Sequence, residues 1–274
     1  MGYAPRVSLP EPSATGTALI TGASSGIGEE IARELAARGH GVTLVARRED
    51  RLRALAEELA SEHDVRAEAL GADLGDAAAR EALPGRVSAL GLDVEILVNN
   101  AGFGGSGDVH RSDPARLAEM VELNAAALVD LQARFTPDMA ERGRGAVINV
   151  ASTSAFQPIP GTATYAATKA FVLALSEATH SELGGKGVTV TAVCPGPVKT
   201  EFAEAAGIGG ANEKGPDFIW TDVEAVARDA VNGADSGDRV VVPGIMNRAG
   251  ALLGQHSPRS VVLPLAKRVW RLAE

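Results

Sequence analysis

The chain has 274 residues, of which 45% are hydrophobic and 22% charged, the ordinary proportions of a globular protein. Its net charge of −9 argues against nonspecific nucleic-acid binding, and its single cysteine, Cys194, excludes an intramolecular disulfide and a cysteine-rich metal site. No apolar run approaches the roughly 18 residues of a membrane span, so we expect a cytoplasmic protein with Cys194 in its core, no metal centre and no nucleic-acid partner.

The beginning of the chain predicts a nucleotide-binding loop. Residues 1–15 contain three prolines and no apolar core of signal-peptide length, so we expect a flexible tail. An apolar strand is predicted at 17–21 and a helix at 29–38, with Gly-Ala-Ser-Ser-Gly-Ile-Gly between them at 22–28. Glycines between a strand and a helix let the backbone approach a ligand, and the free N–H groups at the helix start attract phosphate.

Two other glycine patterns are weaker. Residues 102–107 match Gly-x-Gly-x-x-Gly, but no helix opens directly after them, so we predict a loop. The segment around Ser24 also fits Gly-x-Ser-x-Gly, the nucleophile elbow of hydrolases. Only one strand precedes Ser24, whereas an elbow serine normally follows several. The histidines that a hydrolase would need stand in no recognisable setting: His63, His110, His180 and His256.

The rest of the chain alternates short apolar strands with helices. Strands are predicted at 41–46, 65–70, 94–98, 146–150, 188–193 and 239–242. Helices are predicted at 50–60, at 76–90 with a break at Pro84 and Gly85, at 114–142 as one helix or two abutting ones, at 165–183, and at 221–232 with Thr221 as N-cap. This alternation predicts a single α/β domain, a Rossmann-like, doubly wound parallel sheet of about seven strands with helices on both faces.

Five candidate residues lie just after predicted strands. They are Gly22, Asp73, Asn99, Ser152 and Pro195. Because sheets of this kind bind ligands outside the carboxyl ends of their strands, we expect the functional site along that one edge.

A phenol and an ammonium occur at helical spacing in this region. Tyr165 and Lys169 are four residues apart, so they lie one turn apart on the same face of the predicted helix. A phenol normally keeps its proton to a pKa of about 10, and an adjacent ammonium favours the phenolate, so the pair can form an acid–base group. Ser152 could reach the same point from a strand end. Taken alone, the spacing is more typical of a half-buried tyrosine beside a solvated lysine.

Six motifs in register give the chain a family resemblance, which covers about residues 17–242. They are Thr21-Gly-Ala-Ser-Ser-Gly-Ile-Gly28, Asn99-Asn-Ala-Gly102, Asn124 in the long helix, Ser152, Tyr165-Ala-Ala-Thr-Lys169 and Pro195-Gly-Pro-Val-Lys-Thr200. In their order and spacing they resemble the short-chain dehydrogenases/reductases. The resemblance implies a catalytic domain over 16–243 that transfers hydride between a nicotinamide cofactor and a carbonyl or alcohol substrate, assembled as a homodimer or homotetramer.

The resemblance also implies roles for individual residues. Tyr165 would be the general acid/base, Lys169 would hold the nicotinamide ribose and lower the Tyr165 pKa, and Ser152 would hydrogen-bond the substrate oxygen. Asn124 would hold a water linking Lys169 to solvent, although by itself it could be a capping or kink residue. The expected cofactor-binding residues are Gly22, Ser24, Ser25, Gly26, Ile27, Gly28, Arg47, Arg48, Asp73, Leu74, Asn100, Ala101, Gly102, Tyr165, Lys169, Pro195, Gly196, Val198 and Thr200. The expected substrate contacts are Ser152, Ser154, Phe156 and Phe202.

The end of the second strand predicts which cofactor is used. An NAD site usually has an acid there for the ribose 2′-hydroxyl, whereas arginine suits the 2′-phosphate of NADP. Here Arg47 and Arg48 follow the strand, and no acid precedes Glu49. We therefore expect NADP(H) to be preferred over NAD(H), with Arg47 as the main phosphate ligand. A solvated basic helix start, an NAD-dependent alcohol dehydrogenase and a catalytically idle dinucleotide-binding scaffold remain the alternatives.

The C-terminal segment, residues 244–274, differs in charge from the rest. It carries one acid, Glu274, against five basic residues: Arg248, Arg259, Lys267, Arg268 and Arg271. Ser257-Pro258 is a sound helix start, and Pro264 interrupts the apolar spacing that follows. We predict a basic helical extension packed on the domain or on a partner subunit. The alternative, contact with a membrane surface, is disfavoured because the acidic body would oppose anionic lipid.

Overall fold

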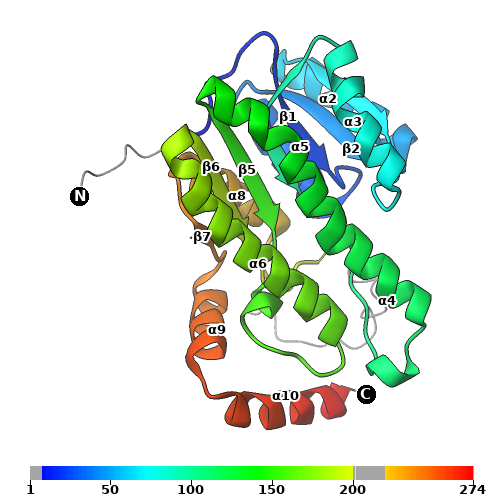
Figure 1. Ribbon diagram of the computed structural model, residues 1–274, viewed down its shortest axis with the longest axis vertical. Helices are drawn as coiled ribbons and strands as arrows, with labels where there is room; N and C mark the ends of the chain where they lie inside the picture. Colours follow the sequence, from blue (N-terminus) through cyan, green and yellow to red (C-terminus); the bar gives the residue numbers. More distant parts are fainter. Residues whose placement is uncertain (1–7, 200, 202–219, 274) are drawn as a thin grey trace.

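Seven parallel strands form the centre of the molecule (Figure 1). The structure is a computed structural model that describes residues 8–199, 201 and 220–273. The strands are β1 (Gly16–Thr21), β2 (Gly41–Ala46), β3 (Ala67–Gly71), β4 (Asp93–Asn99), β5 (Gly145–Val150), β6 (Val188–Val193) and β7 (Val240–Val241). Their order in the sheet is β3-β2-β1-β4-β5-β6-β7, so the chain adds strands first on one side of β1 and then on the other. This order confirms the predicted doubly wound sheet.

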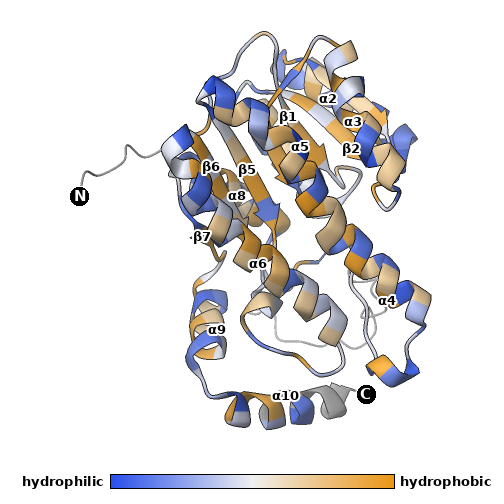
Figure 2. Ribbon diagram, viewed as in Figure 1, coloured by the Kyte–Doolittle hydropathy of each residue, from blue (hydrophilic) through white to orange (hydrophobic). Residues whose placement is uncertain are grey.

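Helices cover both faces of this sheet and bury two large apolar cores. On one face, Ile31, Leu52 and Val231 pack with Ile20 of β1; on the other, Leu83 and Leu131 pack with Leu19. The first face is covered by α1 (Gly26–Ala37), α2 (Glu49–His63) and α8 (Val223–Asp235). The second is covered by α3 (Ala77–Ala89), α5 (Ala127–Arg142) and α6 (Ala163–Leu183), and α4 (Pro114–Val121) packs on α6. Figure 2 shows the strands as largely apolar, as strands buried on both faces require.

Two of the predicted helix boundaries were wrong. The helix over 76–90 does not break at Pro84: α3 is continuous, because a proline removes only one backbone donor and the buried Leu83 and Val87 anchor both sides of it. The cap of α8 is Asp222 rather than Thr221. Asp222 accepts from the Ala225 N–H, whereas the Thr221 hydroxyl accepts from Asn247.

The long segment over 114–142 is one continuous helical rod with an irregular turn. Between α4 and α5 lies a π-helical turn, Glu122–Ala126, which contains Asn124. Turns of this kind occur frequently at functional sites, where the extra residue redirects the side chains next to it. Cys194 lies in a third, smaller core beside α6, as expected, and burial raises the pKa of its thiol to about 12.

The start of the described chain is more ordered than a loose tail. Residues 8–15 were expected to be flexible, yet Leu9 is buried in the core under α8 and its N–H donates to the Asp235 carboxylate at 3.3 Å. Ser13 accepts from the Gly16 N–H at 2.9 Å, which fixes the entry into β1. One buried leucine and these hydrogen bonds hold a segment whose prolines alone suggested disorder.

Two helices follow β7, where the sequence predicted one. α9 (Ile245–His256) was missed, and α10 (Arg259–Ala273) begins just after Pro258, as predicted, and continues through Pro264. Figure 1 shows both beyond the carboxyl ends of the strands. Six large apolar side chains here are exposed: Ile245, Met246, Leu252, Leu253, Val261 and Leu263. Within the described residues, no helix is both long and apolar enough to cross a membrane.

Candidate active site

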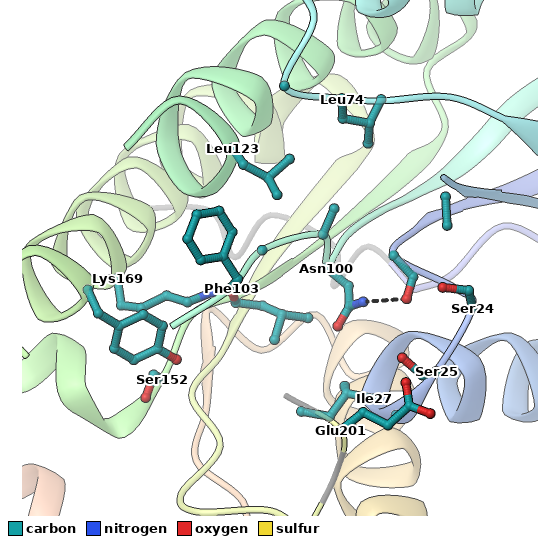
Figure 3. Close-up of a pocket in the computed structure, with 18 of the residues that line it drawn as sticks. Ser24, Ser25, Ile27, Leu74, Asn100, Phe103, Leu123, Ser152, Lys169 and Glu201 are labelled. Carbon is teal, nitrogen blue, oxygen red and sulfur yellow. Dashed lines mark hydrogen bonds between the residues drawn. The ribbon is translucent and has the colours of Figure 1, made fainter. Parts of the chain in front are cut away.

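A cleft of about 1240 Å³ opens along the carboxyl edge of the sheet, where the site was expected. The segments after β1, β3, β4, β5 and β6 all line it. Figure 3 shows Ser152 and Lys169 on one side and Ser24, Ser25 and Ile27 on the other, with Asn100 and Phe103 between them. The cleft therefore brings Ser152 and Lys169 together with the glycine loop, which lies more than a hundred residues earlier in the sequence.

The loop after β1 has the backbone conformation that its glycines permit. Gly22 and Gly26 have φ values of +67° and +62°, which other residues rarely adopt, and both line the cleft. Gly28 is buried instead, and a Cβ there would collide with the Asn100 side chain and the Gly22 carbonyl. The first two glycines thus shape the concave surface, while Gly28 lets α1 approach the neighbouring strand.

Asn100 ties this loop to the end of β4. Its side-chain amide donates to the Thr21 carbonyl at 2.9 Å and to the Gly22 carbonyl at 3.3 Å. The Thr21 hydroxyl in turn accepts from the N–H groups of Asn100 and Ala101 at 2.9 and 3.0 Å. Ala101 and Gly102 line the cleft next to it. These bonds explain how two motifs separated in the sequence form one rigid wall.

The ends of β2 and β3 supply the next part of the wall. Arg47 and Arg48 are exposed and line the cleft, as do Asp73 and the buried Leu74. Arg48 donates to the hydroxyls of Ser24 and Ser25 at 2.8 to 3.1 Å. Asp73 accepts from the Gly75 N–H at 3.0 Å, and the cap of α3 is Asp76.

Ser152, Tyr165 and Lys169 meet at the other end of the cleft. The Lys169 ammonium is buried, donates to the Val150 carbonyl at 2.7 Å and lies 5.8 Å from the centre of the Tyr165 ring. The Ser152 hydroxyl accepts from the Ser154 N–H at 3.1 Å and shares a hydrogen bond with Tyr165. Helical spacing on α6 and the end of β5 therefore bring the three groups together.

Burial sets the ionisation of this group. It raises the Tyr165 pKa to about 12 against the opposing hydrogen bond from Ser152, and it lowers the Lys169 pKa to about 8. Desolvation of the phenolate outweighs the hydrogen bond from Ser152, so the pKa of Tyr165 moves upward, and a lowering of that pKa by Lys169 stays a prediction. A phenol with this pKa carries its proton at neutral pH and can donate it to an oxygen that gains negative charge.

The buried ammonium predicts a pH dependence of stability. Since the folded protein releases the Lys169 proton near pH 8 and the unfolded chain near 10.4, stability should rise with pH between these values, by up to about 3 kcal/mol in total. Lys169→Met removes this contribution. In urea unfolding, wild type should therefore gain stability relative to the variant from pH 7.5 to pH 9.5. The exposed Lys186→Met is the matched control, and parallel curves for wild type and Lys169→Met would contradict the assignment.

Asn124 is buried in the π-helical turn, and its side chain makes three hydrogen bonds. Its carbonyl oxygen accepts from the Phe103 N–H at 3.0 Å, and its amide donates to the Phe103 carbonyl at 2.9 Å and to the Thr168 hydroxyl at 3.2 Å. The side chain thereby fixes the loop after β4 against α6, one residue before Lys169. The irregularity at Asn124 is a π-helical turn within a continuous helix, and a water between Asn124 and Lys169 stays a prediction.

The substrate side of the cleft differs in part from the expectation. Ser154 lines it, but Phe156 packs against the small core that contains Ala151 and Leu173. Phe103 and Trp220 also line the cleft, and Arg116 lies over the Phe103 ring at 3.7 Å. One side of the helical segment after residue 114 also lines the cleft, although it was not predicted from the sequence. Its residues recur at helical spacing, which could have revealed them: Ala115, Arg116, Ala118, Glu119, Glu122 and Leu123.

The segment after β6 closes the cleft beside the tyrosine. Pro195, Gly196 and Val198 line it, and the N–H of Thr221 donates to the Pro197 carbonyl at 2.9 Å. A Cβ on Gly196 would meet the Asn247 side chain of α9, so the C-terminal extension supports this wall. Thr200 and Phe202 lie outside the described residues.

The hydrolase interpretation of Ser24 lacks a base. All five histidines belong to the described residues, and none of them lines the cleft. The Ser24 hydroxyl contacts the Arg48 guanidinium, which cannot accept its proton. A nucleophilic serine needs an adjacent base, so we set this alternative aside.

Known proteins resemble this chain in sequence and in fold. Residues 16–208 match the family model of the short chain dehydrogenases. The NADP-dependent 3-hydroxy acid dehydrogenase YdfG of Salmonella typhi is 38% identical over 187 residues, which are 68% of this chain and 74% of that protein. A short-chain dehydrogenase from Sphingobium yanoikuyae in complex with NADPH is 38% identical with a TM-score of 0.78, covering 91% of this chain and 95% of its own. The bulky-bulky ketone specific alcohol dehydrogenase from Comamonas testosteroni is 32% identical with a TM-score of 0.73, covering 89% and 95%.

Proposed function

Because this chain belongs to the short-chain dehydrogenase/reductase family of oxidoreductases, we propose that it reduces a ketone or aldehyde with NADPH, reversibly, and that Tyr165 is the general acid. One observation carries the proposal: Ser152, Tyr165 and Lys169 meet in the same cleft as the glycine loop. A nicotinamide cofactor bound there would supply the hydride. The protein then has to stabilise and protonate the oxygen that becomes an alkoxide.

The side chains of the site divide this work between them. The Ser152 hydroxyl orients the substrate oxygen through a hydrogen bond, and Tyr165 gives its proton to that oxygen. The raised pKa of Tyr165 keeps the proton available at neutral pH, which favours the direction of reduction. Lys169, buried behind the ring, holds the ribose of the cofactor and supplies positive charge beside the phenol. Asn124 links Lys169 to solvent through a water.

The proposed choice of NADPH rests on the basic end of β2. The positive-φ Gly22 and Gly26 line the cleft where α1 begins, and the first N–H groups of a helix have no partner within it, so the loop fits the pyrophosphate of a dinucleotide. Arg47 and Arg48 offer guanidinium groups where the ribose would lie, with no acid before Glu49. The names of two relatives, NADP-dependent in one and in complex with NADPH in the other, support the same choice. The alternative is an NAD-dependent alcohol dehydrogenase.

The walls of the cleft favour a mostly apolar substrate. Phe103, Leu123, Val198 and Trp220 line the cleft, and one relative is described as specific for bulky ketones. A panel of carbonyl compounds, followed by the loss of NADPH absorbance, tests the proposal. We expect turnover of aryl and alkyl ketones and little of charged sugars, and the reverse order would contradict the proposed substrate class. If no carbonyl is reduced although NADPH binds, the catalytically idle scaffold becomes the better interpretation.

The assembly and location of the protein are further parts of the proposal. We place a homodimer or homotetramer contact on the long helices, where Val129 of α5 and Phe171 of α6 are exposed. The C-terminal extension packs on the domain through Ala251, Val262 and the Arg259 guanidinium, which donates to the Phe156 and Gly254 carbonyls. Its exposed apolar residues suit a partner subunit better than an anionic membrane, which the acidic body would oppose. We propose the cytoplasm as the location.

A further inference from the structure

Two arginines of α2 converge on one carboxylate from a distant part of the chain. Arg48, the N-cap residue of α2, donates to Glu201 Oε2 at 2.8 Å, and Arg51, in the first turn, donates to Glu201 Oε1 at 2.8 Å. Each guanidinium thus takes one oxygen of the same carboxylate. The arginines and the glutamate are about 150 residues apart, so only the fold makes this contact.

This carboxylate lies at the dinucleotide end of the cleft. Glu201 and Arg48 both line it, and Arg48 also holds the hydroxyls of Ser24 and Ser25 in the glycine loop. Figure 3 shows Glu201 next to Ser25 and Ile27, far from Lys169. The end of β2 and the glycine loop meet at this point, and the adenosine ribose of a dinucleotide lies there in sheets of this type.

The chemistry of the contact is that of anion recognition. Guanidinium groups bind carboxylates and phosphates in the same geometry, with two N–H donors toward two oxygens. The hydrogen bonds from Arg48 and Arg51 lower the Glu201 pKa to about 2, so the carboxylate is charged at any pH used for assays. All three side chains are 42% to 48% exposed, so water and salt screen the pairs and an incoming anion can replace the carboxylate.

We propose that Glu201 is an internal competitor of the 2′-phosphate for Arg48 and Arg51, and that Arg51 is therefore a phosphate-binding residue in addition to Arg47 and Arg48. The inference rests on the proposed use of NADPH. A 2′-phosphate carries up to about two negative charges against one on Glu201, so it displaces the carboxylate when NADPH binds. NADH has no such group and leaves Glu201 paired. The contact of Glu201 with Arg48 and Arg51 thereby lowers the affinity of the two arginines for anions. It does not affect the binding of the other parts of the cofactor.

Calorimetry with two nucleotide fragments tests the competition without any turnover. Adenosine 2′,5′-bisphosphate carries the 2′-phosphate, and 5′-AMP lacks it. In Glu201→Gln we expect the bisphosphate to bind about 2- to 10-fold more tightly, as the loss of two exposed ion pairs implies, and 5′-AMP to bind as in wild type. Glu57→Gln is the matched control. Glu57 is an exposed residue of α2, so this variant removes one negative charge as well and should leave both affinities unchanged.

A second variant tests the role of Arg51. In the Glu201→Gln background, Arg51→Gln should weaken the bisphosphate several-fold and leave 5′-AMP unchanged. In wild type, Arg51→Gln should reduce the affinity for the bisphosphate less, because it also weakens the hold on the competing Glu201 carboxylate. The difference between the two effects measures the coupling between Arg51 and Glu201. Both positions are exposed, and thermal unfolding monitors whether the variants fold.

The possible outcomes separate this inference from the proposed function. One outcome is that wild type binds the bisphosphate better than 5′-AMP, but Glu201→Gln binds the bisphosphate no more tightly than wild type does. The proposed competition is then wrong, and the use of NADPH stands. If Arg51→Gln has no effect in the Glu201→Gln background, Arg51 is no phosphate ligand. If wild type does not distinguish the two fragments, the choice of NADPH fails and this inference fails with it.

Discussion

Tyr165→Phe is expected to lower NADPH-dependent carbonyl reduction by about 10²- to 10⁴-fold, the contribution of a positioned general acid. The substitution removes one hydroxyl and keeps the ring on α6, so the packing around Lys169 should persist. Steady-state rates with a ketone found by the carbonyl panel measure the loss. The affinity for NADPH, measured by calorimetry, should change much less than the rate, because the hydroxyl is one of many expected cofactor contacts.

The pH dependence separates a chemical role of Tyr165 from a structural one. Burial raises its pKa to about 12, so the acid stays protonated through the assay range and reduction by wild type should not decline because Tyr165 loses its proton. In the reverse reaction the same group must act as a base, so alcohol oxidation should rise as pH increases. The phenylalanine variant should lose that rise. Reduction at full rate by Tyr165→Phe would show that another group supplies the proton.

Arg47→Ala is expected to weaken NADPH binding by about 10- to 100-fold and to leave NADH binding nearly unchanged. A hydrogen bond between charged groups contributes about 1.5 to 3 kcal/mol, and NADH lacks the phosphate that would receive it. The comparison of kcat/KM for the two cofactors in wild type and variant measures the effect. Arg53→Ala removes an equal charge from an exposed position on α2, the helix that follows Arg47, and serves as the control.

The cofactor prediction has a clear contrary result. If wild type uses NADH more efficiently than NADPH and Arg47→Ala changes neither, the basic residues after β2 are a solvated helix start. If Arg47→Ala has little effect but Arg48→Ala or Arg51→Gln selectively weakens NADPH, the phosphate lies nearer α2 than the sequence suggested. The hydrogen bonds that Arg48 makes to Ser24 and Ser25 make this second result a specific possibility to measure.

The fold could be read from the sequence because its signals are local. Parallel strands buried on both faces appear as continuous apolar runs, and all seven predicted runs became strands of one sheet. The glycine loop and the Tyr165–Lys169 spacing were equally local, since each depends on one strand end or one helical turn. The errors came where tertiary packing overrode a local preference. Pro84 is held inside α3 by buried neighbours, and Leu9 is held under α8 despite the prolines around it.

The sequence by itself thus determined which reactive groups the protein has and at which edge of the sheet they gather, because both follow from residue type and strand order. Only the tertiary structure decided their surroundings. It buried Lys169 and desolvated the Tyr165 phenol, which raises the pKa of Tyr165. It packed Phe156 against the small core beside α6, brought Trp220 into the cleft, and set Glu201 between Arg48 and Arg51. Desolvation and contacts across 150 residues depend on packing in three dimensions, which no local pattern records.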